Sequence, residues 1–185
     1  SKKPLSIYVG CAKWNRSDLK GFYPRGTKDE LTYYATQFNS IEMNTTFYKS
    51  PTKEQVETWK NKTPDGFKFF PKITQSISHY GRLLNFEEKL EAFVDSTVLF
   101  EEKLEMAFLQ MINNFKPKDF DRVERFVEKF PKGYPLALEV RNEEWFEPEN
   151  AEIWIDASSM VAGVKMLLGI NPKQDYKNKV AQVSL

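Results

Sequence analysis

The segment Ser40-Ile41-Glu42-Met43-Asn44 decides the fold, because apolar and polar side chains alternate along it. Successive side chains of a β-strand point to opposite faces of the sheet, so Glu42 and Asn44 share one face and the apolar residues share the other. Polar residues recur in the same way near the ends of later segments, at Lys72 and Thr74, at Gln110, and at Glu139 and Arg141. The strands of a barrel turn one face to the helices and the other to the lumen, so this pattern favours a barrel.

Strand-like segments alternate with helical patterns along the chain, which is the signature of βα units and a parallel sheet. The sequence predicts strands over residues 6–11, 40–45, 67–73, 106–111 and 136–141. Helices are expected between the strands, with these starting signals: the capping-box pairs Thr27/Glu30 and Thr52/Gln55, then Asn85, and then Asp119. The predicted fold class is therefore α/β.

The composition disfavours several classes of protein. The 27 Lys and Arg residues nearly balance the 26 Asp and Glu residues, and a formal net charge of +1 disfavours a strongly basic nucleic-acid binder. The single cysteine, Cys11, cannot form an internal disulfide, so we expect a reducing compartment and a cytoplasmic location. No apolar run has the length of a signal-peptide core or of a membrane span, so we expect no membrane partner.

Several motifs follow one another in order along the chain: Gly10 with Trp14, Phe22-Tyr23-Pro24, Tyr34 with Phe38, the run from Ile41 to Tyr48 that ends at Pro51, Trp59, Pro64, Phe67, Lys72, Thr74, His79, Leu109-Gln110, Glu139, Arg141 and Trp145. In these residues the chain resembles the YecE-like family, a TIM-barrel family catalogued as domain of unknown function 72. The resemblance covers roughly residues 6–146. It implies a (β/α)8 barrel with a site at the C-terminal ends of the strands, and it supplies no reaction.

The last part of the chain, residues 147–185, does not follow the remaining strands of that family. Such barrels typically need about 250 residues, so we expect an incomplete barrel with about five to seven βα units. We treat residues 1–185 as a single (β/α) barrel domain, whose tail is atypical or is spliced from segments that are not adjacent in a longer chain. Within the tail, Glu152–Asp156 and Val164–Leu168 are strand-like, and Asp175–Val183 has a helical pattern.

Three residues are candidates for acid and base chemistry. Glu42 and Glu139 lie at strand ends on the polar face, and two carboxyl groups in different surroundings can act as acid and base. The alternative role is structural, because Glu139 can pair with Lys72 or Arg141 inside a barrel. His79 is the only histidine of the chain and can carry protons near neutral pH, or it can fix its own loop through a hydrogen bond.

The same residues limit the metal chemistry that the chain supports. Catalytic zinc sites commonly use two or three histidines, and this sequence has one. A hard cation between Glu42, Glu139 and substrate oxygens is an open alternative, although the spacing does not require it. We therefore predict no tightly bound metal and no cofactor.

Positive charge on the polar face indicates an anionic ligand. Arg141 offers a planar fork and Lys72 a point charge, which together suit a compact phosphate or carboxylate group. Aromatic residues that follow strand ends can stack on a ligand, although most aromatic side chains of this chain must belong to the core. The predicted ligand-binding residues are Trp14, Asn44, Tyr48, Lys72, Gln110, Arg141 and Trp145.

Together these patterns predict an enzyme that carries out acid and base chemistry on a small phosphorylated or carboxylated metabolite, with Glu42, His79 and Glu139 as its catalytic residues. The alternative is a non-catalytic barrel that binds a regulatory ligand or a nucleic-acid fragment with the same side chains. The sequence leaves the substrate, the reaction and the oligomeric state open.

Overall fold

The computed structural model describes residues 5–150 and the strand at 164–168. The strands are β1 (Gly10–Cys11), β2 (Ser40–Met43), β3 (Lys68–Pro71), β4 (Ala107–Gln110), β5 (Leu136–Val140) and β6 (Val164–Leu168). The α-helices are α1 (Glu30–Gln37), α2 (Thr45–Tyr48), α3 (Lys53–Asn61), α4 (Gln75–Ser78), α5 (Glu87–Thr97) and α6 (Phe120–Lys129). Short 3-10 helices are η1 (Val98–Lys103), η2 (Pro117–Asp119), η3 (Glu143–Phe146) and η4 (Pro148–Asn150). No helix in this part of the chain has the length and apolarity needed to cross a membrane.

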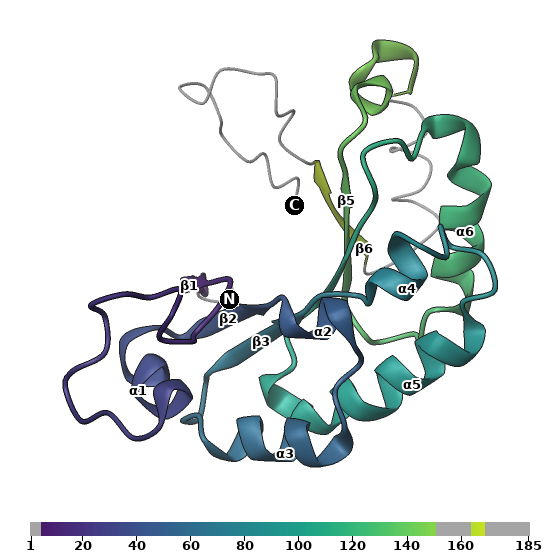
Figure 1. Cartoon of the computed structure of the whole chain (residues 1–185). Coiled ribbons are helices and arrows are strands. Elements are labelled where there is room, and N and C mark those ends of the chain that lie inside the picture. Colours follow the sequence, from purple (N-terminus) through teal and green to yellow (C-terminus); the bar gives the residue numbers. More distant parts are fainter. Residues whose placement is uncertain (1–4, 151–163, 169–185) are drawn as a thin grey trace.

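The strands are parallel and follow chain order in two three-stranded sheets that continue along one arc (Figure 1). Strands β1 to β3 form one set and β4 to β6 another. Backbone hydrogen bonds join the two sets, since the amide of Ile73 donates to the carbonyl of Phe108 at 2.9 Å and the amide of Glu105 donates to that of Phe69 at 3.0 Å. The α/β prediction and the strand at Val164–Leu168 are confirmed.

The sequence predicts an incomplete barrel of the (β/α)8 type, and the described residues form no closed barrel. Six parallel strands make an arc, and closing a sheet of this kind requires the first and last strands to pair. The other predicted elements of the tail, Glu152–Asp156 and Asp175–Val183, lie outside the described residues.

Helices cover the outer side of the arc and leave the other side of the strands facing inward (Figure 1). Ile41 and Met43 of β2 pack with residues of α1 and α3 in one hydrophobic cluster. Leu109 of β4 and Leu138 of β5 pack with residues of α5 and α6 in a second cluster. Because side chains alternate along a strand, the residues between these apolar positions lie on the opposite side, which we call the inner face.

The first strand is shorter than predicted. At Gly10 a Cβ atom would lie 2.0 Å from the carbonyl oxygen of Ser40, so only glycine lets β1 approach β2 this closely. Before Gly10, the side chain of Asn39 takes the place of a neighbouring strand's backbone. It accepts from the amide of Val9 at 2.7 Å and donates to the carbonyl of Ile7 at 2.8 Å. Regular pairing is therefore limited to Gly10–Cys11.

Two of the predicted helix starts differ from the structure. The capping box at Thr52 is confirmed, with Gln55 bonded back to the Thr52 amide. The capping box predicted at Thr27 is wrong, because Asp29 caps α1 through the amide of Thr32, and aspartate is a stronger N-cap than threonine. Helix α5 starts at Glu87 rather than at Asn85, whose positive φ of 49° places it in the preceding turn.

A buried lysine ties η1 to the end of α3. The Nζ atom of Lys103 donates to the carbonyl oxygens of Lys60 at 2.8 Å and Thr63 at 2.6 Å. It also lies 3.2 Å from the hydroxyl of Thr63. The last carbonyls of a helix have no partner within the helix, so this ammonium group acts as a C-terminal cap supplied from another element.

We predict that Lys103→Met destabilises the protein by about 1–3 kcal/mol, because the side chain is buried and its removal deprives buried carbonyls of a donor. Urea unfolding followed by circular dichroism measures the change. The matched control is Lys132→Met, at an exposed lysine. Equal unfolding midpoints for the two variants would show that the Lys103 cap contributes nothing.

Candidate functional site

Four polar side chains on the inner face form a continuous hydrogen-bonded chain across β3, β4 and β5. Lys72 donates from Nζ to the Oε1 atom of Gln110 at 2.8 Å. Gln110 donates from Nε2 to the Oε2 atom of Glu139 at 2.9 Å. Arg141 donates from Nε to the other carboxylate oxygen of Glu139 at 3.0 Å. We call these four residues the strand-end cluster.

Strand register explains why these side chains meet. Gln110 is the direct partner of Glu139 in the β4–β5 pair, and Lys72 forms a parallel bridge with Phe108. Paired residues of adjacent strands point to the same face, so all these side chains face inward at the C-terminal ends of their strands. The alternation in the sequence therefore determines which face these side chains occupy, and the strand register determines which of them are neighbours.

Lys72 is the most enclosed member of the cluster, with only 8% of its surface exposed. Its Nζ atom lies 4.3 Å from the centre of the Phe47 ring and 5.7 Å from that of Phe108, within the range of cation–π contact. Burial lowers the pKa of Lys72, and the charge of Arg141 lowers it further, against the opposing attraction of Glu139 and Glu42.

The end of β2 lies beside the cluster. Glu42 is exposed, and the amide nitrogen of Asn44 lies 3.4 Å from the Oε1 atom of Glu42 and 3.2 Å from the carbonyl oxygen of Ala12. The hydroxyl of Thr46 lies 2.7 Å from the carbonyl oxygen of Lys72 and so ties α2 to the end of β3. Glu42 is thus close enough to Lys72 for charge interaction but does not belong to the hydrogen-bonded chain.

His79 directly follows the last residue of α4 and also contacts Phe47. Its Nδ1 atom lies 2.8 Å from the hydroxyl of Ser78, and its ring packs edge-on against Phe47 with 4.8 Å between the ring centres. Burial lowers the pKa of His79, and the positive charges of Lys72 and Arg141 lower it further. The neutral imidazole is therefore favoured in the folded protein.

The predicted aromatic residues are not part of the strand-end cluster. Trp14 packs edge-on against Trp59 of α3, with 5.8 Å between the ring centres, on the helix side of the sheet. Trp145 is 1% exposed, and its indole nitrogen donates to the carbonyl oxygen of Phe115 at 2.6 Å, so it lies in the core. Tyr48 is 69% exposed and has an edge contact with Phe47.

Sequence reasoning missed the two rings that enclose Lys72. Phe47 lies three residues after Asn44, and its exposed neighbour Tyr48 was predicted to bind the ligand instead. Phe108 lies on β4 two residues before Gln110. Period-two alternation does assign Phe108 to the inner face, so an aromatic side chain at that position is a usable signal.

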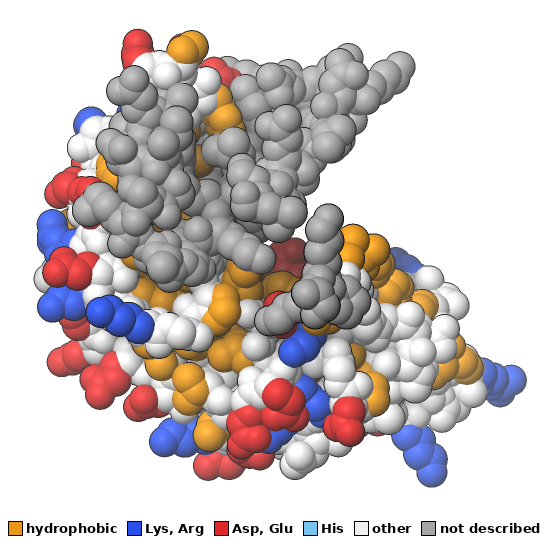
Figure 2. Space-filling view, turned by 180° about the vertical axis from the view of Figure 1, so that it is seen from behind, with side chains coloured by type: hydrophobic (Ala, Val, Ile, Leu, Met, Phe, Trp, Pro, Cys, Tyr) orange, Lys and Arg blue, Asp and Glu red, His pale blue; other side chains and the backbone are white. Residues whose placement is uncertain are grey.

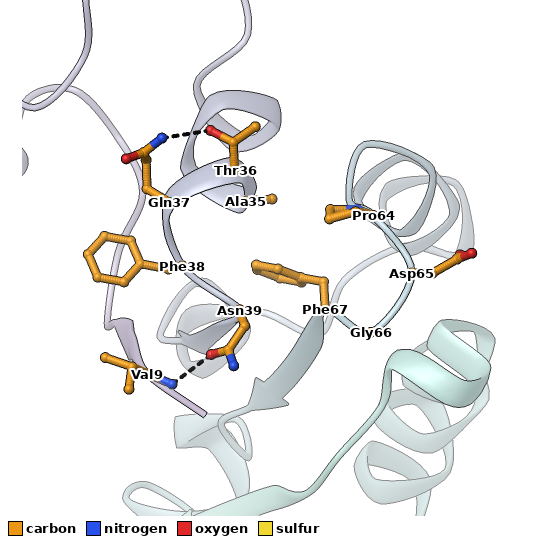
Figure 3. Close-up of a pocket in the computed structure, with 10 residues that line it drawn as sticks. All are labelled: Val9, Ala35, Thr36, Gln37, Phe38, Asn39, Pro64, Asp65, Gly66 and Phe67. Carbon is orange, nitrogen blue, oxygen red and sulfur yellow. Dashed lines mark hydrogen bonds between the residues drawn. The ribbon is translucent and has the colours of Figure 1, made fainter. Parts of the chain in front are cut away.

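A separate hollow of about 530 Å³ lies at the other end of the strands (Figure 3). Loops before β2 and β3 form most of its wall, including Phe38, Asn39, Pro64 and Phe67. The carboxylate of Asp65 points away from it (Figure 3). No residue of the strand-end cluster lines the hollow, so it is not the candidate site.

Charge on the outside of the molecule is mixed in sign. Figure 2 shows acidic and basic side chains interspersed along the outer edge of this face, and ion pairs such as Arg125 with Asp121 connect them. Within the described residues, no three His, Cys, Asp or Glu side chains come together as a metal site. Charges of mixed sign give little long-range attraction for an anion, so the local charges of the strand-end cluster dominate the field there.

Comparison with known proteins gives a consistent family. The model of a protein family described as "Protein of unknown function DUF72" matches residues 8–161. The chain is 26% identical over 165 residues to the UPF0759 protein YecE of Escherichia coli K12, covering 88% of this chain and 58% of that protein. It is 30% identical over 151 residues to the UPF0759 protein YunF of Bacillus subtilis, covering 77% of this chain and 53% of that protein.

Solved structures show the same likeness. A DUF72 family protein from Enterococcus faecalis superposes with a TM-score of 0.73 at 25% identity, over 87% of this chain and 60% of that one. A DUF72 family protein from Thermotoga maritima gives a TM-score of 0.69 at 28% identity, over 86% of this chain and 63% of that one. The chain spans less than two thirds of the length of these relatives. It belongs to the DUF72 family of proteins of unknown function.

Proposed function

We propose that this protein is an enzyme that uses acid and base chemistry on a small phosphorylated or carboxylated metabolite at the strand-end cluster. The single observation behind this proposal is the hydrogen-bonded chain from Lys72 through Gln110 and Glu139 to Arg141. A carboxylate held between two cationic side chains, at the ends of parallel strands, is an arrangement in which α/β enzymes place reacting groups.

The charges of the cluster favour a compact anion. Lys72 and Arg141 are the cationic members of the cluster, and Glu139 and the neighbouring Glu42 oppose them, so the anion is expected at the exposed Arg141. Arg141 is exposed, and its bond to Glu139 uses Nε, so the terminal nitrogens of its fork can serve a phosphate or carboxylate group. In this proposal Glu139 and Glu42 exchange protons with the ligand, and His79 acts as an auxiliary proton carrier.

We further propose that the arc of strands belongs to a barrel of the (β/α)8 type. Neighbouring strands follow chain order, helices cover the outer side, and polar side chains occupy the inner face near the C-terminal ends. These three features are typical of that fold. In such a barrel the inner face would become the lumen, and the cluster would lie at its catalytic rim.

Binding of a compact anion is the first prediction of this proposal. Inorganic phosphate, glycerol 3-phosphate and pyruvate are the probes, and a ligand at 100 times its dissociation constant adds about 2.7 kcal/mol to stability, which thermal unfolding detects. We expect Arg141→Gln to weaken binding about 10- to 100-fold, because it removes a charge-assisted hydrogen bond.

The matched control for that test is Arg125→Gln, at an exposed arginine of α6 that pairs with Asp121. This variant is expected to bind the probes like the parent protein. A shift with single-stranded oligonucleotides and none with the compact anions would overturn the proposed ligand class and favour a nucleic-acid-binding protein.

A second prediction separates an enzyme from a binding protein. Glu139→Gln keeps the size of the side chain and one of the two oxygens that accept from Gln110 and Arg141, but it removes the acid and base function. We expect it to retain anion binding and to lose turnover by at least about 100-fold, the lower range for general acid–base catalysis. Turnover is followed by phosphorus NMR on the phosphorylated probe that stabilises the protein, with Glu128→Gln of α6 as the control. Undiminished turnover in Glu139→Gln would refute the role of Glu139.

A third prediction concerns the only histidine. Because burial and nearby positive charge disfavour the imidazolium, the pKa of His79 lies below about 6.5 in the folded protein. The contribution of neutral His79 to the stability of the fold is thus present above the pKa that this residue has in the unfolded chain, and it is lost as the pH falls below that value. Proton NMR of the ring follows this titration without ambiguity.

Lys72→Met provides the test of the cause, since removing the lysine charge should raise the pKa of His79. Lys132→Met, at an exposed lysine, should leave that pKa unchanged. An identical titration in both variants would show that Lys72 and His79 do not share one site.

A further inference from the structure

We infer that Lys72 is a nucleophile that forms a Schiff base with an aldehyde or ketone, so that the substrates of this site are carbonyl compounds that also carry an anionic group. This inference rests on the proposed function for the anionic group only. The formation of the covalent bond depends on Lys72 and its surroundings.

The surroundings of Lys72 differ from those of the other buried lysine. Lys103 is 6% exposed, and three oxygen atoms lie within 3.2 Å of its Nζ atom. Lys72 is buried to the same degree, but within the described residues its Nζ atom has a single oxygen acceptor, on Gln110. An ammonium group has three N–H donors, so the charge is well satisfied at Lys103 and poorly satisfied at Lys72.

Aromatic rings take the place of the missing acceptors. Phe47 and Phe108 lie beside the Nζ atom of Lys72 at 4.3 and 5.7 Å. The rings attract a cation, but they do not replace the hydration that burial removes. Desolvation of this kind produces the neutral amine that nucleophilic catalysis requires.

Several charged groups face Lys72 and set its protonation. Glu139 and Glu42 favour the ammonium form, Arg141 opposes it, and burial is the largest influence and lowers the pKa of Lys72. The net result favours the neutral amine at a lower pH than for an exposed lysine. His79, the remaining titratable neighbour, is itself biased towards its neutral form.

The reaction balances without a co-reactant. The ammonium of Lys72 first gives up one proton, and the free amine attacks the carbonyl carbon to form a C–N bond. A proton moves from nitrogen to the former carbonyl oxygen and gives a carbinolamine. The proton released at the start then returns to the hydroxyl group, which leaves as water, and a C=N iminium remains. The iminium keeps the positive charge beside Glu139.

Reductive trapping tests this inference on the full chain. Glyoxylate, which has a carbonyl and a carboxylate, is incubated with the protein at pH 7, and sodium borohydride then converts any iminium to a stable secondary amine. Peptide mass spectrometry locates the added group. We expect more label at Lys72 than at Lys103 or at exposed Lys132, because burial lowers the pKa of Lys72 and so leaves more of its amine unprotonated at pH 7.

Variants separate this inference from the proposed function. Lys72→Arg keeps the charge without a usable nucleophile and should lose the label. Arg141→Gln should reduce labelling by glyoxylate more than labelling by acetaldehyde, which has no anionic group. Some loss with acetaldehyde is expected, because the charge of Arg141 lowers the pKa of Lys72. If acetaldehyde labels Lys72 and glyoxylate has no advantage, the lysine nucleophile stands and the anion site fails. If anions bind but labelling at Lys72 equals that at Lys132, the Schiff-base inference is overturned.

Discussion

The structure depends on a lysine that is almost removed from water at the joint between the two sets of strands. Lys72 forms a parallel bridge with Phe108 of β4, one of the two bridges between the sets in the described residues, and its backbone carbonyl also accepts the hydroxyl of Thr46. A buried charge must find partners or lose its proton. The Gln110 and Glu139 side chains supply partners on one side, and Phe47 supplies a ring on the other. The packing of the inner face follows from this requirement.

The hydrogen-bonded chain also connects strands that belong to two separate hydrophobic clusters. The cluster around Ile41 and Phe69 lies under the first three strands, and the cluster around Leu109 and Leu138 lies under the later ones. The strand-end cluster spans the junction on the opposite face of the sheet. Deforming the junction would therefore disturb the position of Glu139 relative to Lys72, which couples the stability of the fold to the geometry of the candidate site.

Much of this arrangement could be predicted from alternation alone. The sequence assigns four polar residues to one face, because each alternates with the apolar residues of its segment: Glu42, Lys72, Gln110 and Glu139. Their contacts could not be predicted, because the direct pairing of Gln110 with Glu139 depends on strand register. The burial of Trp145 could not be predicted either, since a tryptophan after a strand end fits a pocket wall and a core equally well.

An anionic substrate and a nucleophilic Lys72 place opposing demands on the same site. A negative group about 4 Å from the amine would favour the ammonium by about 4 kcal/mol at an effective dielectric constant of about 20, and doubling the distance halves this energy. In the proposed reaction the anionic group would therefore bind towards Arg141, with the carbonyl carbon turned towards Lys72. Glu139 lies between these two cations along the hydrogen-bonded chain. Its charge stabilises the protonated iminium once formed, because a carboxylate attracts that cation.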